Sequence, residues 1–249
     1  MTDKIKDISL TQVEDGIIIK LEKVPSGRHY LEVVETFGDL NRRATHQQLN
    51  RYDEELHVLG VSLSIIYRVA TCYHGCLGGP HIFERLAART HNLACSAHHL
   101  IERGLYDEAL NLIRSLGEIA NLFCLFYADE KALITWLHSD SKTRMNDFKP
   151  VDVRRSLEKI GKKDLMLATK DWYSNFCSEY THVHPGTKPN VHNERGQGHA
   201  GGRFQDKGLA YCMGELATCC SYIALFASQY GGLKDSFKEL RTAVATYNK

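Results

Sequence analysis

Apolar residues recur at spacings of three and four along most of this chain of 249 residues. The clearest early run consists of Leu49, Tyr52, Leu56, Leu59, Leu63, Ile66 and Tyr67. Such spacing gathers apolar side chains on one face of an α-helix, and each of these faces must be buried against another element. The sequence therefore predicts an all-α fold, a multi-helix up-and-down bundle around one core.

Glycine and proline residues mark where the helices are expected to begin and end. Gly104 and Gly161 are typical of a helix C-terminus, whereas Pro80 and Pro150 suit a first helical turn. The pattern predicts roughly five to eight helices, within about residues 39–76, 80–103, 107–129, 130–136, 150–160, 163–183, 206–230 and 233–247. Residues 139–149 are expected to form a polar connection.

The first 38 residues are less regular than the rest of the chain. Residues 16–21 form a short β-branched run ahead of a Pro-Ser-Gly turn, and this composition is typical of a strand, although no partner strand is recognised. We expect an irregular N-terminal arm over residues 1–38. A helical bundle domain follows over residues 39–249, with an irregular loop at about 184–205.

Charge and composition limit the class of protein. The chain carries 31 basic and 30 acidic residues, so no global field attracts nucleic acid, and such binding would need a local patch. Residues 1–10 lack the apolar core of a signal peptide, and no apolar run of membrane-spanning length is recognised. The eight cysteines are then expected as reduced thiols. We expect a cytoplasmic protein without membrane contact.

Arg114 and Glu118 lie one helical turn apart in the helix expected over 107–129. They project away from the main apolar stripe, yet three leucines flank them: Leu110, Leu122 and Leu125. We therefore expect another helix to cover the pair, and a covered ion pair needs further hydrogen-bond partners. The alternative is an ordinary surface pair worth about 0.2–0.5 kcal/mol.

Tyr180, His182 and His184 lie where the helix over 163–183 is expected to end, because Pro185 stops helical geometry. A histidine at the negative end of the helix dipole is well placed to exchange protons with a substrate. His184 is therefore a candidate catalytic acid or base. The alternative is a helix-terminal cation that satisfies the last carbonyl groups.

The loop that follows is rich in glycine. Its run from Gly196 to Arg203 could present backbone N–H groups and an arginine to an anion just before a helix begins. It matches neither the phosphate loop of nucleotide hydrolases nor the dinucleotide fingerprint. A flexible surface loop is the alternative. The candidate substrate-binding residues around the loop are Tyr180, His182, Arg195 and Arg203.

Histidine clusters leave zinc open as a cofactor, although no zinc motif is recognised and no other cofactor is predicted. The first cluster lies in and before the loop and contains His182, His184, His192 and His199. The second lies on one helix face and contains His91, Cys95, His98 and Glu102. Packed, hydrogen-bonded side chains are the alternative at both places.

Two short motifs carry a resemblance to a known family. Residues 109–118, ALNLIRSLGE, follow the pattern Ala-x-x-Leu-x-Arg-x-x-x-Glu, and residues 172–185 take the place of a later helix that ends in histidine. The chain thus resembles a poorly characterised, mostly bacterial family of helical proteins, itself similar in architecture to the HEPN superfamily. It departs from the HEPN motif, in which four to six residues separate Arg from His, because Arg195 and His199 are one residue too close.

The resemblance implies a HEPN-like helical protein that acts on or binds RNA or a nucleotide, in bacterial defence or a stress response, as a homodimer. If it is a ribonuclease, Arg114 would hold a phosphate, His184 would move the proton and Glu118 would orient Arg114. A non-catalytic protein-interaction module is the alternative, in which Arg114, Glu118 and Tyr180 form a buried network that fixes helix packing. A metal-dependent hydrolase is the third hypothesis.

Overall fold

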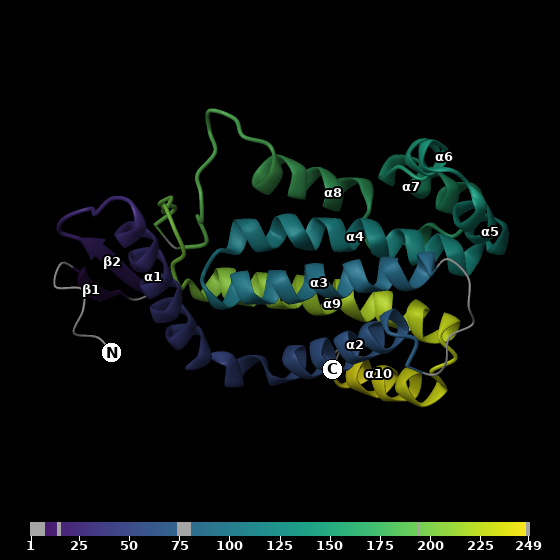
Figure 1. Cartoon of the computed structure of the whole chain (residues 1–249), viewed down its shortest axis with the longest axis horizontal. Helices are drawn as coiled ribbons and strands as arrows, with labels where there is room; N and C mark the ends of the chain where they lie inside the picture. The colour runs from purple at the N-terminus through teal and green to yellow at the C-terminus, as the bar shows by residue number, and fades with distance from the viewer. Residues whose placement is uncertain (1–7, 14–15, 74–80, 194, 248–249) are drawn as a thin grey trace.

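The computed structural model describes residues 8–13, 16–73, 81–193 and 195–247. These residues form a packed helical bundle, which confirms the predicted all-α class. Figure 1 shows the long helices running along the longest axis of the molecule, with the N-terminal hairpin at one end and the short helices labelled α5, α6 and α7 at the other.

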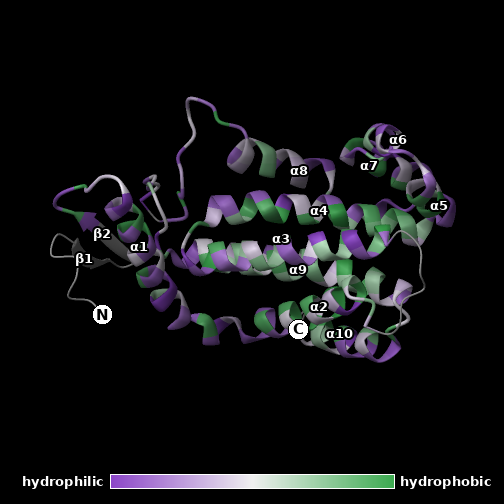
Figure 2. Ribbon diagram, in the orientation of Figure 1, coloured by the Kyte–Doolittle hydropathy of each residue, from purple (hydrophilic) through white to green (hydrophobic). Residues whose placement is uncertain are grey.

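Five long helices form the body of the bundle: α2 (Asp53–Ala70), α3 (Ile82–Glu102), α4 (Tyr106–Ala128), α9 (Asp206–Tyr230) and α10 (Lys234–Tyr247). Helix α9 packs against all four others, and α3 also packs against α2 and α4. Figure 2 shows hydrophobic residues along α4 and α9 and hydrophilic residues along much of α1. Four of the cysteines expected as reduced thiols lie buried in this core: Cys124, Cys212, Cys219 and Cys220.

Helices α4 and α9 correct one prediction from the sequence. Both are long and apolar enough to cross a membrane by length and composition, although no run of that kind was recognised in the sequence. In each helix 61% of the apolar window is buried inside the bundle. Their apolar character is therefore explained by their place in the core.

Several predicted helix ends are confirmed. Gly104 and Gly161 follow α3 and α7 with φ angles of 73° and 71°, a left-handed conformation that glycine adopts without steric cost. Pro150 occupies the first turn of α7 (Pro150–Lys159), as expected. Helix α9 begins at Asp206 and ends at Tyr230, within a residue of the predicted bounds.

Residues 139–149, expected as a polar connection, instead contain a short helix. Helix α5 (Glu130–His138) is followed by α6 (Ser141–Asp147) and then by α7. The Asp140 side chain accepts a hydrogen bond of 2.8 Å from the backbone N–H of Thr143, and aspartate is a preferred N-cap residue. A local cap thus explains why this polar segment is helical.

The single helix predicted over 163–183 is wrong. The segment forms a short turn, η2 (Lys163–Leu165), then α8 (Lys170–Phe176), then the π-helical turn η3 (Cys177–Thr181). Between η2 and α8, the side chain of buried Asn121 accepts hydrogen bonds from the backbone N–H groups of Leu167 and Ala168 and donates one to the carbonyl of Ala168. These bonds replace the helical ones and separate η2 from α8.

The N-terminal region is more regular than predicted. Strands β1 (Ile8–Val13) and β2 (Gly16–Leu21) pair in antiparallel register, with Ile8 opposite Leu21 and Val13 opposite Gly16. The predicted strand over 16–21 therefore has a partner. Helix α1 (Arg28–His46) and the turn η1 (Leu49–Tyr52) follow, so the predicted boundary at residue 38 falls inside a helix.

Candidate functional site

Arg114 and Glu118 form the predicted ion pair on α4. Nη1 of Arg114 lies 2.5 Å from Oε1 of Glu118, and the two side chains are 20% and 26% exposed. Nη1 of Arg114 also donates a hydrogen bond of 3.0 Å to the hydroxyl of Tyr173 on α8. The expectation that another helix covers the pair and supplies a further partner is confirmed.

Arg154 of α7 adds a second cation to this cluster. The guanidinium groups of Arg114 and Arg154 lie over the ring of Tyr173, at 5.4 Å and 4.7 Å from its centroid. Nε of Arg114 and Nη1 of Arg154 are buried without a hydrogen-bond partner among the described residues. Within the described parts of the chain Glu118 is the one carboxylate paired with these groups, so two guanidinium charges face one negative charge. We call Arg114, Glu118, Arg154 and Tyr173 the arginine cluster.

Burial raises the pKa of the Glu118 carboxyl, whereas the charge of Arg114 and a hydrogen bond with Tyr173 act in the opposite direction. Desolvation disfavours a carboxylate, and a nearby cation favours it. Protonation of Glu118 would leave both arginines without a negative partner. The cluster therefore has unused capacity to bind an anion, and that capacity increases when Glu118 is neutral.

Helix α4 also meets the segment that carries Tyr180, as expected, but one turn before Arg114. Nδ2 of Asn111 donates a hydrogen bond of 2.5 Å to the carbonyl of Tyr180, and the hydroxyl of Thr181 donates one of 2.7 Å to Oδ1 of Asn111. The ring of Tyr180 packs on Phe176. Tyr180, in η3, is thus held against α4, and no contact joins it to Arg114 among the described residues.

His182 and His184 follow the end of η3 and are exposed. Nδ1 of His184 accepts a hydrogen bond of 3.1 Å from the backbone N–H of Gly186, which defines a local turn. Within the described residues, neither histidine contacts Arg114 or Glu118. The structure does not bring the three predicted catalytic residues, Arg114, Glu118 and His184, together.

The loop after His184 is fixed to the bundle through Asn190, which is buried and has a positive φ of 50°. Its backbone N–H donates to Oδ2 of Asp107 at 2.7 Å, and its Oδ1 accepts from the N–H of Tyr106 at 3.1 Å. Its carbonyl accepts from Nε2 of Gln205 at 2.9 Å. The loop is therefore attached to the first turn of α4 and to the residue before α9.

The other candidate residues of the loop make contacts elsewhere, away from the arginine cluster. Nε2 of His192 lies 2.9 Å from Oδ1 of Asp107, and its ring stacks on Tyr180. The guanidinium group of buried Arg203 contacts Nε2 of His199. Arg195 is exposed on the surface of the loop. These residues do not form one site with the arginine cluster.

Neither predicted histidine cluster forms a metal site in the described residues. One group of three metal-ligand side chains lies close together there, and it consists of Cys72, His81 and Glu84. The sequence held a signal for it, because Cys72 and His81 bracket a glycine-rich stretch and Glu84 follows one turn later. That stretch was interpreted only as the end of a helix.

A further half-buried carboxyl, that of Glu215, lies on α9 and contacts α8. The indole N–H of Trp172 donates a hydrogen bond of 3.0 Å to Oε2 of Glu215. Burial raises the pKa of Glu215 above its ordinary value of 4.5, and the bond from Trp172 acts in the opposite direction. The folded protein thus holds this proton to a higher pH than the unfolded chain does.

Replacing Glu215 by glutamine is expected to raise the unfolding temperature at pH 7. The stabilising effect of the raised pKa is fully present below about pH 4.5 and is lost as the pH rises through the folded-state pKa. The amide keeps an acceptor for Trp172 without a charge to desolvate. Thermal unfolding of both proteins at pH 4 and pH 7 measures the effect, with exposed Glu239→Gln as control. A gain of the same size at both pH values would contradict it.

The fold and the site define an all-α bundle protein with a half-buried, net-positive arginine cluster between α4, α7 and α8. Comparison with protein-family models, with curated proteins and with solved structures gives no match to this chain.

Proposed function

We propose that this protein binds RNA or a nucleotide through phosphate contacts to Arg114 and Arg154. The observation that carries the proposal is the charge of the arginine cluster, in which two guanidinium groups share one carboxylate. Arginine binds phosphate oxygens through paired N–H donors, and buried donors without partners favour a ligand that supplies acceptors. The resemblance to HEPN-like bundles supports the same class of ligand.

Cleavage of RNA would need a further step. His184 is exposed on a loop, so a bound substrate would have to extend from the arginine cluster to that loop, or the loop would have to move toward α4. The proposal therefore concerns binding first, with ribonuclease activity as a second readout. The expected homodimer and the cytoplasmic location stay predictions.

Arg154→Gln is expected to weaken binding of a fluorescently labelled single-stranded RNA at least about tenfold, since a charge-assisted contact is worth about 1.5–3 kcal/mol. Arg155→Gln is the matched control, because Arg155 is the next residue, is 72% exposed and pairs with Asp152. We expect the control to change the affinity less than about twofold. Fluorescence anisotropy measures both.

The same samples test for cleavage. If the wild-type protein cleaves the RNA, Arg114→Ala should abolish cleavage, and loss in His184→Ala would assign the proton transfer to that histidine. Cleavage that Arg114→Ala leaves unaltered would contradict the mechanism. No RNA or nucleotide binding by the wild-type protein, or equal losses in Arg154→Gln and Arg155→Gln, would contradict the proposed function itself.

A protein-interaction module is the second candidate, and one observation favours it. Arg114 already joins Glu118 to Tyr173 and so ties α4 to α8. On that view the arginine cluster has a structural role, because removing one partner leaves the other buried and unpaired. A clear loss of thermal stability in Arg114→Ala, together with no binding of RNA or nucleotide by the wild-type protein, would favour this role.

A further inference from the structure

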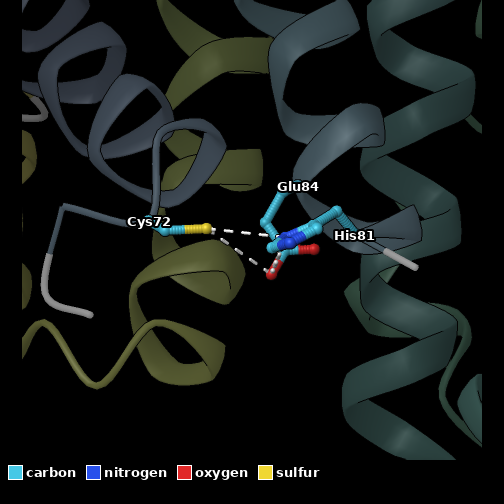
Figure 3. Close-up of side chains that lie close together, drawn as sticks. All are labelled: Cys72, His81 and Glu84. Atoms are coloured by element: carbon cyan, nitrogen blue, oxygen red, sulfur yellow. Dashed lines mark hydrogen bonds and ion pairs between the residues drawn. The ribbon is translucent and has the colours of Figure 1, made fainter. Parts of the chain in front are cut away.

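Cys72, His81 and Glu84 bring three different metal-ligand atoms together between the end of α2 and the start of α3 (Figure 3). Nδ1 of His81 lies 3.7 Å from Sγ of Cys72 and 3.6 Å from Oε1 of Glu84. The third distance, from Sγ of Cys72 to Oε1 of Glu84, is 4.0 Å. The three atoms thus form a nearly equilateral triangle whose members come from two helix ends.

The size of this triangle fits a zinc ion. Tetrahedral zinc, with bonds of about 2.3 Å to sulfur and about 2.0–2.2 Å to nitrogen and oxygen, holds its ligand atoms about 3.4–3.6 Å apart. The observed distances exceed these by only about 0.1–0.4 Å. An N···O distance of 3.6 Å is in contrast too long for a good hydrogen bond. A thiolate, an imidazole and a carboxylate together are a ligand set typical of zinc.

The backbone gives an independent indication. Cys72 and His81 have φ angles of 52° and 49°, and Asn190 is the one other non-glycine residue with a positive φ in the described part of the chain. This left-handed conformation is sparsely populated by side-chain-bearing residues and concentrates at functional sites. At Cys72 this conformation belongs to the C-terminal turn of α2, in which the N–H groups of Cys72 and Tyr73 donate to the carbonyls of Val69 and Arg68. His81, just before α3, is therefore the ligand position whose left-handed backbone the helix end does not explain.

A pocket of 440 Å³ adjoins two of the three residues. Cys72 and Glu84 are part of its wall, with Arg68 and Tyr73 beside them and mainly apolar side chains elsewhere. Zinc sites that keep three protein ligands and an open fourth position are typical of catalytic or ligand-binding zinc. A zinc ion held by this triangle would have a cavity next to it large enough for a small organic ligand.

We propose that Cys72, His81 and Glu84 bind one zinc ion, with the fourth position available to water or to a ligand in the adjoining pocket. The site shares no residue with the arginine cluster and does not depend on the proposed function. In the folded protein the ion would join the end of α2 to the start of α3. Metal binding would therefore also stabilise the packing of these two helices.

Cobalt substitution tests the proposal. The full chain is stripped of metal with a chelator and titrated with Co²⁺ while its absorption spectrum is recorded. Zn²⁺ is then added to displace the bound Co²⁺. We expect one equivalent of Co²⁺, a thiolate-to-cobalt charge-transfer band, and a higher unfolding temperature with Zn²⁺. Cys72→Ser should abolish that band. His81→Ala and Glu84→Gln should lower the affinity at least about tenfold, because even residues behind a metal ligand change it by about 10–100-fold.

Cys95→Ser is the matched control. Cys95 also has a histidine beside it, with its Sγ 3.7 Å from Nε2 of His91, but no third ligand in the part of the chain that the structure describes. The control should keep the band, the stoichiometry and the stabilisation by Zn²⁺. A wild-type protein that binds no Co²⁺ or Zn²⁺, or a charge-transfer band that persists in Cys72→Ser, would overturn the proposal. Circular dichroism of each variant shows that a lost signal reflects lost ligands and not unfolding.

Discussion

Gly104→Ala is expected to lower the free energy of unfolding by about 2–5 kcal/mol. Gly104 has a φ of 73°, and an alanine in this conformation costs roughly 1–2 kcal/mol. Its Cβ would also lie 2.5 Å from the backbone carbonyl carbon and oxygen of Arg203, and overpacking of this kind costs about 1–3 kcal/mol. The carbonyl of Gly104 accepts a hydrogen bond from the N–H of Arg203, so the loop before α9 would have to move.

Gly161→Ala separates the two causes. Gly161 has nearly the same φ, 71°, but no atom lies within 4 Å of its added Cβ. Gly161→Ala should therefore lower the free energy of unfolding only by the cost of the left-handed backbone, roughly 1–2 kcal/mol. Urea unfolding of both variants measures the difference. Equal losses would contradict the close contact between the α3–α4 turn and the loop.

Asn121→Ala should have an effect of similar size, about 2–4 kcal/mol. The side chain of this buried residue bonds two N–H groups and one carbonyl of Leu167 and Ala168, at 3.0 Å, 3.1 Å and 2.7 Å. Its removal leaves these backbone groups unsatisfied, and a buried unsatisfied group costs about 1–3 kcal/mol.

Hydrogen exchange locates the damage from Asn121→Ala. The amides of Leu167 and Ala168 should exchange faster in the variant, because they lose their acceptor. Asn175→Ala, at an exposed position on α8, is the control and should change stability by less than about 0.5 kcal/mol. If Asn121→Ala were as mild as this control, the account of why the predicted helix over 163–183 is broken would be wrong.

The long helices could be predicted from the sequence because their signals are local. Each of these signals restricts the backbone of the residues next to it. Examples are Gly104 after α3, Pro150 in the first turn of α7, and the glycines before and after α9. The break before α8 could not be predicted, since its cause is Asn121, which lies more than forty positions earlier in the chain. The partner of β2 was missed because the polar alternation of β1 is a weak signal in an isolated pair of strands.

The candidate site shows the same limit. The pair of Arg114 and Glu118 is an i,i+4 contact, so its spacing alone suggested it. Tyr173 and Arg154 come from two other helices, and their approach depends on how α7 and α8 pack on α4. The expected contact of Arg114 with His184 failed to form, because the π-helical turn η3 ends at Thr181 and His184 belongs to a surface turn.

The salt dependence of RNA affinity tests the central claim most directly. A contact between arginine and phosphate releases counterions, so each lost contact with single-stranded nucleic acid reduces the slope of log affinity against log salt by about 0.7. We expect a shallower slope for Arg154→Gln than for the wild-type protein, and an unchanged slope for Arg155→Gln. Identical slopes for all three proteins would contradict phosphate binding at the arginine cluster.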